Sequence, residues 1–185
     1  MKFARLAVAT DRAQIPSDRD LVTTIGACLD AGLRTVILRE LDLPRPDRVA
    51  LAAELSALGA RVIAAHEALP TCAGVHLPAG ARAGSGAWGR SCHSAADVSA
   101  AAVEGASWAT LSPFAPTASK PGYGPPIERS AYAGHAIPTF ALGGVTPANA
   151  DQAILAGAHG VVAMGSVMRS DRPGDVIGAL LRAIG

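Results

Sequence analysis

Short apolar runs alternate along the chain with longer Ala-rich segments in which apolar residues recur at three and four positions. The runs have the length of buried strands, and the segments have the period of amphipathic helices. This alternation is typical of successive βα units on a parallel sheet. The predicted strands are Arg5–Thr10, Thr35–Arg39, Arg61–Ala65, Gly74–Leu77, Trp88–Cys92, Trp108–Ser112, Thr139–Leu142 and Val161–Met164.

The helical period is clear in five segments, and a glycine follows most of them. A glycine just beyond the last periodic residue is typical of a helix end, where the backbone turns left-handed. Gly32, Gly59, Gly105 and Gly157 stand at such positions, and the turn after each leads into the next strand. The predicted helices are Leu21–Asp30, Arg48–Leu58, Ala95–Glu104, Ala148–Leu155 and Asp175–Ile184.

About eight parallel strands is the number that closes a (β/α)8 TIM barrel. We therefore predict a single TIM-barrel domain over residues 1–185. The stretch 66–87 holds a strand but little room for helices, so we expect shortened βα units there. A doubly wound open sheet is the alternative, because the chain is shorter than the roughly 250 residues of a typical barrel.

Charge and composition narrow the class of partner. Sixteen basic and 15 acidic residues give a formal net charge of +1, too little to attract nucleic acid or a membrane surface. Aromatic residues make up only 4% of the chain, which leaves few platforms for stacked bases. The apolar run at the start stops at Asp11, well short of a signal peptide or a spanning helix. We expect a cytoplasmic protein with a small-molecule ligand, and neither nucleic acid nor membrane as partner.

The sequence offers little to hold a metal ion. Cys28, Cys72 and Cys92 are far apart and form no Cys-x-x-Cys pair, so we expect buried thiols in a reducing compartment. His66 and Glu67 follow the third strand, but no second carboxylate stands at metal-ligand spacing beside them. We therefore assign no metal ligands.

Two glycine turns after the last two predicted strands suggest a phosphate site. Gly143 and Gly144 precede a Thr-Pro helix start, and Gly165 and Ser166 follow the final strand. Residues without side chains let the backbone approach an anion, and the start of a helix offers N–H groups. Such paired turns form the phosphate site that many barrels share. The alternative is that these glycines only allow a tight turn.

The fifth strand ends in residues suited to proton transfer. Ser91 and His93 alternate toward one face, whereas Cys92 between them should face away and pack. A histidine exchanges protons near neutral pH. A structural role, in which His93 caps the helix begun by Ser94 or binds a backbone carbonyl, stays open. His76 on the fourth strand either points into the barrel or packs against its neighbour.

Cationic side chains mark two further places. Arg39 ends the second strand and offers a planar fork to a carboxylate or phosphate, with Glu40 as the group that orients it. An ion pair at the barrel rim is the alternative. Residues 113–126 form a long loop rich in Pro, Gly, Ser and Thr, with Lys120 near its centre. We expect this loop to be a lid that brings Lys120 over a ligand.

These motifs together resemble the thiamine phosphate synthase/TenI family nearly from end to end. The resembling segments are Ala9–Asp11, Ile37–Glu40, Gly74–Leu77, Leu142–Pro147 and Ala156–Ala163, of which the last two are the most specific. The resemblance implies a (β/α)8 barrel in thiamine metabolism that binds a thiazole phosphate or thiamine phosphate.

The family contains two kinds of enzyme, a synthase and a tautomerase. The positions at which this chain departs from the synthase motifs distinguish between them. A synthase of this family uses Mg²⁺ to neutralise a leaving pyrophosphate. The resemblance implies that such a synthase carries a lysine after the second strand and acidic motifs after the third and fourth strands. This chain has Leu41 for the lysine, Ala64–His66 for the first motif and Pro78–Ala81 for the second. A TenI-type tautomerase shifts a proton within a carboxylated thiazole phosphate and needs no metal.

The resemblance therefore favours a thiazole tautomerase without a cofactor. In this reading His93 matches the catalytic histidine, Arg39 orients the substrate carboxylate, and the phosphate binds Gly143, Gly144, Gly165 and Ser166. Ser91 and the loop Thr117–Lys120 are synthase-like, because the synthase uses them to contact pyrophosphate. A divergent synthase with Mg²⁺ and a non-catalytic binding or regulatory protein stay open. Exposed Ala-rich helices suit a homodimer.

Overall fold

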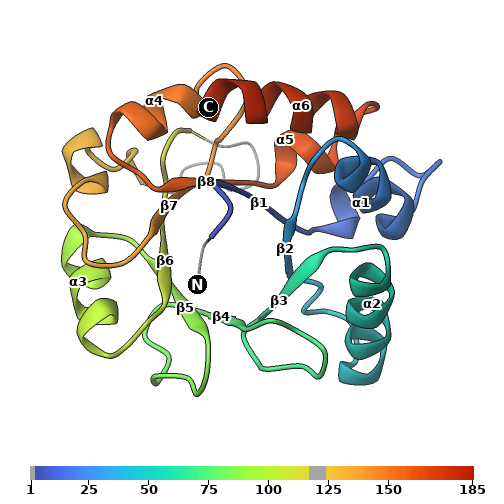
Figure 1. Ribbon diagram of the computed structural model, residues 1–185, viewed down its shortest axis with the longest axis horizontal. Coiled ribbons are helices and arrows are strands. Elements are labelled where there is room, and N and C mark those ends of the chain that lie inside the picture. Colours follow the sequence, from blue (N-terminus) through green and yellow to red (C-terminus); the bar gives the residue numbers. More distant parts are fainter. Residues whose placement is uncertain (1–2, 117–123) are drawn as a thin grey trace.

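The computed structural model describes residues 3–116 and 124–185, and eight parallel strands in it form a closed barrel in chain order (Figure 1). β1 pairs with both β2 and β8, which closes the sheet and rules out the open alternative. The strands are β1 Leu6–Ala9, β2 Thr35–Leu38, β3 Arg61–Ala65, β4 Val75–Leu77, β5 Trp88–Cys92, β6 Trp108–Leu111, β7 Thr139–Leu142 and β8 Gly160–Ala163. The predicted TIM barrel is confirmed.

Helices surround the barrel. Five of them lie where the sequence period predicts them, with ends that differ by three residues at most, and a sixth, of four residues, was not predicted. They are α1 Leu21–Asp30, α2 Arg45–Ala57, α3 Ala95–Val103, α4 Ala150–Leu155, α5 Gly165–Met168 and α6 Pro173–Ile184, with short 3-10 turns η1 Arg12–Gln14 and η2 Arg129–Tyr132. α2 begins earlier than predicted because Pro46 is accommodated in its first turn. No helix lies between β3 and β4 or between β4 and β5, so the shortened units are confirmed.

The strands are buried on both faces, which explains why they read as continuous apolar runs. Outward-facing residues pack against the helices in one large cluster. The interior of the barrel holds a second cluster of smaller size, formed by Ala7, Ala9, Ile37, Ile63, Ala65, Trp108, Phe140 and Val162. Side chains of the described residues therefore fill the interior of the barrel.

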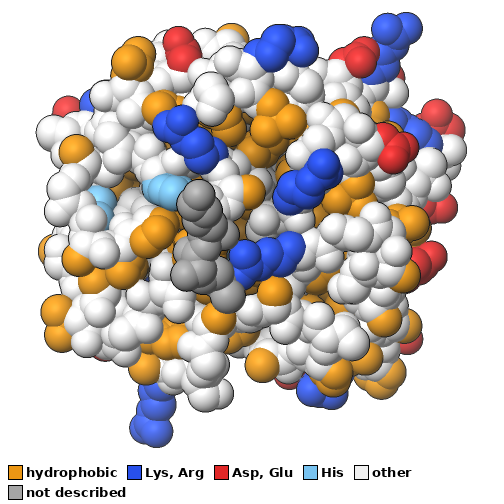
Figure 2. Space-filling model, in the orientation of Figure 1, with side chains coloured by type: hydrophobic (Ala, Val, Ile, Leu, Met, Phe, Trp, Pro, Cys, Tyr) orange, Lys and Arg blue, Asp and Glu red, His pale blue; other side chains and the backbone are white. Residues whose placement is uncertain are grey.

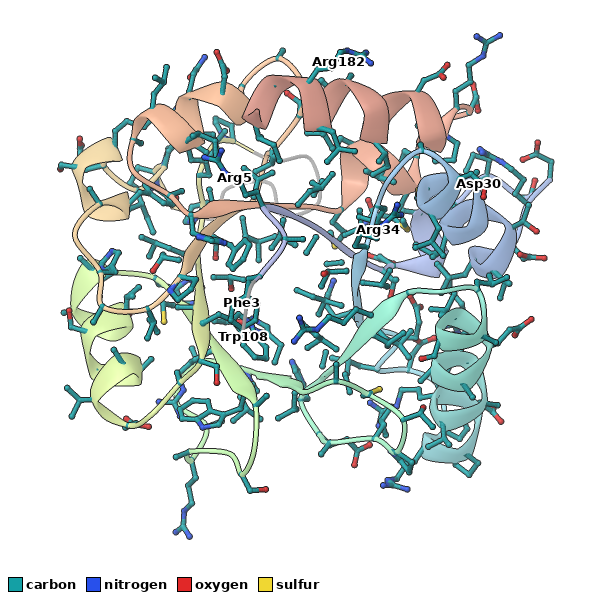
Figure 3. The ribbon with its side chains drawn as sticks, in the orientation of Figure 1. Phe3, Arg5, Asp30, Arg34, Trp108 and Arg182 are labelled. Carbon is teal, nitrogen blue, oxygen red and sulfur yellow. The ribbon has the colours of Figure 1, made fainter. Side chains whose placement is uncertain are left out.

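Aromatic rings close the end of the barrel at which the strands begin. Phe3 lies 5.3 Å from Trp108 and 6.4 Å from Phe140, measured between ring centroids. The figures look onto this end, with Phe3 near the centre (Figure 3) and basic side chains around it (Figure 2). Two of these, Arg5 and Arg34, donate to backbone carbonyls of the adjoining turns. This end is thus structural, and the predicted site residues lie at the other.

His76 is a titratable side chain buried inside the barrel, 7% exposed. Burial lowers its pKa to about 4, and the nearby His66 acts in the same direction. The unfolded chain therefore binds a proton between about pH 6.5 and pH 4 that the folded chain does not. We expect the free energy of unfolding to be highest above pH 6.5 and to fall toward pH 4, by up to about 1.4 kcal/mol per pH unit from this group.

Chemical denaturation across pH measures this slope. A His76→Gln variant serves as the control, because glutamine does not titrate and its slope should be shallower. Equal slopes for the parent and the variant would show that His76 is not the buried titrating group.

The cysteines and the helices bear on two further expectations. Cys28 and Cys92 are buried, and burial raises the pKa of their thiols to about 12 and about 11. Cys72 is only partly buried, so the expectation of buried thiols fails for this residue. None of the helices among residues 3–116 and 124–185 has the length and apolar character needed to cross a bilayer.

Candidate active site

The predicted site residues lie at the carboxyl ends of four strands. Arg39 follows β2, Ser91 and His93 lie at the end of β5, and the two glycine turns follow β7 and β8. Because all strands of a parallel barrel end at the same rim, these residues surround one mouth. Lys120 and the rest of segment 117–123 lie outside the described residues, so the predicted lid stays a prediction.

The turn after β7 depends on its two glycines. Gly143 and Gly144 have φ angles of 91° and 69°, in the left-handed region that favours glycine. A Cβ on Gly144 would also come within 2.5 Å of the carbonyl oxygens of Ala115 and Pro116. Asn149 ties the turn together, since its side chain accepts from the Thr146 N–H and donates to the Gly144 carbonyl, both at 2.9 Å.

Helix α4 contributes less to the β7 turn than the sequence suggests. It begins at Ala150, two residues late, and the N–H groups of Asn149 and Ala150 donate to the Thr146 carbonyl at 3.2 and 3.1 Å. The expectation that this helix start would offer N–H groups to an anion is thus wrong for these two positions. Among the described residues no hydrogen bond uses the N–H of Gly143 or Gly144. The turn itself offers the donors.

The turn after β8 lies beside the first. The Ser166 hydroxyl donates to the Val145 carbonyl at 2.9 Å, which joins the two turns. This hydroxyl is therefore occupied, and a contact from Ser166 to an anion would come from its backbone. Within the described segments, the N–H groups of Gly165 and Ser166 at the start of α5 donate to no other group. The two turns together present four such N–H groups.

Arg169, which sequence reasoning missed, adds a cation to the β8 turn. Its guanidinium folds back over Gly165, so that a Cβ there would come within 2.5 Å of Arg169 Nη1. Gln14 holds the guanidinium through its side-chain carbonyl, and Asp11 accepts from the Gln14 amide at 2.6 Å. No carboxylate in the described part of the chain pairs with Arg169. The signal in the sequence was its spacing, one helical turn after Gly165.

Arg39 lies at the mouth without the partner expected for it. Its guanidinium lies 3.1 Å from the sulfur of Met164, which follows β8. Glu40 does not orient it, because the Glu40 carboxylate accepts from the backbone and the guanidinium of Arg12 at 3.1 and 3.0 Å. The prediction that Glu40 orients Arg39 is wrong, because Arg12 occupies the Glu40 carboxylate. Arg39 is left to bind another group.

His93 is held by contacts on both its backbone and its ring. Its N–H donates to Asp97 at 3.0 Å, while Ser94 accepts from the Asp97 N–H as the predicted N-cap of α3. The bond from His93 is the largest cause that lowers the pKa of Asp97. His93 Nδ1 lies 3.0 Å from the Ser112 carbonyl, which only accepts, so Nδ1 carries the proton. In the neutral ring Nε2 is then the basic nitrogen.

Comparison with known proteins identifies the family. The sequence model described as "Thiamine monophosphate synthase" matches residues 72–167. The chain is 37% identical to a "Putative thiamine-phosphate synthase" of Geobacter sulfurreducens, over 95% of this chain and 92% of that protein. This chain belongs to the thiamine monophosphate synthase/TenI family. The resemblance seen in the sequence is confirmed.

Other comparisons agree with this family. The chain is 38% identical to a "Thiamine-phosphate synthase" of Streptomyces avermitilis, over 46% of this chain and 42% of that protein. A solved thiamine phosphate pyrophosphorylase of Pyrococcus furiosus has a TM-score of 0.83 with 20% identity, and the match covers 97% of this chain and 95% of that one. At that identity the structural match supports the fold alone.

The magnesium implied for a synthase of this family finds no matching ligand set. Ala65 ends β3 and His66 follows it, and Pro78 follows β4, at the places where a synthase of this family would carry its acidic motifs. Glu67 is the nearest carboxylate in sequence, and it pairs with Arg48 and with Arg45. Among the residues described by the structure, no three His, Cys, Asp or Glu side chains gather closely enough to hold an ion. These residues do not fit a carboxylate magnesium site.

Proposed function

We propose that this protein acts in thiamine biosynthesis on a thiazole phosphate, as a metal-independent tautomerase that aromatises a carboxythiazole phosphate. One observation carries the proposal. The mouth joins an anion-suited pair of turns to a histidine with a fixed ring, and the ends of β3 and β4 carry no acidic ligand set. Proton transfer needs the anion site and the histidine, and it does not need a set of metal ligands.

The two glycine turns would bind the phosphate. Their four N–H groups point from fixed backbone, so no reorganisation is needed when the anion enters. Arg169 beside Gly165 would supply the positive charge that N–H groups lack. Charge-assisted hydrogen bonds of this kind are about twice as strong as neutral ones.

Arg39 would bind the carboxylate of the substrate. Its planar fork matches a carboxylate in two hydrogen bonds, and a weak contact to a thioether sulfur is easily exchanged for them. With the phosphate held after β7 and β8 and the carboxylate held after β2, the ring between them would be oriented in the mouth. Orientation of this kind contributes to the rate because the reacting atoms start near their final geometry.

His93 would move the proton. Its basic Nε2 takes a proton from the ring carbon of the ylidene form, and the imidazolium then returns a proton to the exocyclic carbon. The electron pair of the broken C–H bond enters the ring, and the exocyclic double bond takes up the new proton. Substrate and product have the same composition, so the step needs no oxidant, reductant or leaving group.

The proposal is tested with the nonaromatic carboxythiazole phosphate, followed by absorbance as the ring becomes aromatic. We expect the purified protein to raise the initial rate well above that of buffer, in proportion to its concentration. A rate equal to that of buffer would contradict the proposal.

A second candidate is a divergent thiamine phosphate synthase, which the names of the relatives favour. Ser91 supports it as well, because this residue resembles a pyrophosphate contact of the synthase. An assay with pyrimidine diphosphate, thiazole phosphate and Mg²⁺ decides, since formation of thiamine phosphate would assign the synthase. A binding protein would instead show tight thiazole phosphate binding by calorimetry and no turnover in either assay.

A further inference from the structure

A chain of hydrogen bonds runs through the interior of the barrel below Ser91. Trp108 Nε1 donates to His76 Nδ1 at 3.1 Å, and His76 Nε2 lies 3.1 Å from the Ser91 hydroxyl oxygen and 3.2 Å from that of Thr110. Trp108 enters the barrel from its wall and lies beside Phe3 (Figure 3). The chain thus leads from the aromatic closure at one end of the barrel toward the mouth at the other.

Strand register and one glycine make this chain possible. His76 pairs with Gly89, and Gly89 pairs with Trp108, so the three residues form one row across β4, β5 and β6. Gly89 has no side chain, and a Cβ there would overlap the indole ring of Trp108. The indole therefore crosses over β5 and reaches the imidazole on β4. The two ring planes are inclined by only 18°, which suits a bond in the plane of both.

The indole fixes the tautomer of His76. An indole N–H only donates, so His76 Nδ1 must be the nitrogen without a proton. Burial lowers the pKa of His76 to about 4, so the ring is neutral and its one proton is on Nε2. Nε2–H then donates to the two hydroxyl oxygens within its reach.

Ser91 is left with one proton to give. Its oxygen accepts from His76, so its own O–H points to another acceptor. Among the described residues no further hydrogen bond joins the Ser91 side chain, which is partly exposed at the end of β5. Thr110 is 1% exposed, so Ser91 is the hydroxyl of this pair that a ligand reaches.

We propose that His76, held by Trp108 across Gly89, is a positioning residue that makes the Ser91 hydroxyl a hydrogen-bond donor to the ligand. This inference rests on the proposed function, because it takes the substrate to occupy the mouth at the end of β5, where Ser91 is partly exposed. It adds a preference, because a ligand that presents an acceptor atom to β5, such as an anionic oxygen or an unprotonated ring nitrogen, gives the Ser91 proton a partner. A donor group at that place could use only the second lone pair of the Ser91 oxygen and would leave the Ser91 proton without an acceptor.

The first test measures the tautomer in the protein without ligand. ¹⁵N NMR of labelled histidine reports which ring nitrogen carries the proton, and we expect Nε2–H for His76. A Trp108→Phe variant keeps a ring in the core but lacks the N–H, so it should show a mixture of tautomers. The matched control is Trp88→Phe, because Trp88 is also buried but lies in the outer core cluster. A parent with Nδ1–H overturns the inference, even if Trp108→Phe does not fold.

The second test measures binding of thiazole phosphate by calorimetry. We expect Trp108→Phe to weaken binding about fivefold, the value of one neutral hydrogen bond, and Trp88→Phe to leave it unchanged. In a Ser91→Ala background the Trp108 substitution should have no further effect, because the donor is already absent. An equal loss in both backgrounds would assign Trp108 a packing role and overturn the inference. A parent that binds no thiazole phosphate would refute the proposed function, while the NMR result would still stand.

Discussion

A His93→Ala variant is expected to lose about 10²- to 10⁴-fold in the rate of aromatisation, the usual contribution of a positioned acid or base. The ring of His93 is oriented by the Ser112 carbonyl, and its backbone is fixed by Asp97 at the start of α3. The contact from Nδ1 to the Ser112 carbonyl leaves Nε2 as the basic nitrogen, so an alanine removes the group that carries the proton. Initial rates of aromatisation, compared at saturating substrate, measure the loss.

The matched control is His135→Ala. This histidine binds a backbone carbonyl as well, but it precedes β7 at the opposite end of the barrel. Its removal should leave the rate unchanged. A His93→Ala protein as fast as the parent would take His93 out of the reaction, and partial recovery of the rate by added imidazole would support its role as the proton carrier.

An Arg169→Gln variant is expected to bind thiazole phosphate about 10- to 100-fold more weakly, as the loss of a hydrogen bond to a charged group predicts. The guanidinium lies against Gly165 and beside N–H groups that donate to no described residue. Glutamine keeps a polar side chain at this place and removes the positive charge. Calorimetry on the parent and the variant measures the difference.

The matched control is Arg172→Gln, because Arg172 is exposed and pairs with Asp175 at the start of α6. It should bind thiazole phosphate like the parent. The thiazole alcohol, which lacks the phosphate, should bind the Arg169 variant and the parent alike. Equal affinity of both proteins for the phosphate would mean that Arg169 does not contact it.

The barrel could be predicted from the sequence because the apolar period of the helices and the glycines at their ends agree at most positions. Gly32, Gly59, Gly105 and Gly157 all have positive φ angles at helix ends, as their places in the pattern indicate. The one-turn helix α5 was missed because four residues contain no full apolar period. The early start of α2 was missed because Pro46 reads as a break, although a first turn accepts it.

Site residues were predicted where a local sequence motif identifies them. Contacts were missed where they join residues of different strands. Two adjacent glycines, Gly143 and Gly144, are enough to predict a turn with left-handed backbone, and their positive φ angles agree with this prediction. The hydrogen bond between Trp108 and His76 depends on the register of three strands, which cannot be deduced from the sequence. The pairing of Glu40 with Arg12 was missed for the same reason, because these residues follow different strands.

We infer that the mouth of this barrel transfers a proton without a divalent ion. The most direct measurement is the initial rate of aromatisation of carboxythiazole phosphate by chelator-treated protein, before and after Mg²⁺ is restored. We expect the same rate in both conditions, well above that of buffer. A protein that is silent after chelation and becomes active with Mg²⁺ would contradict it.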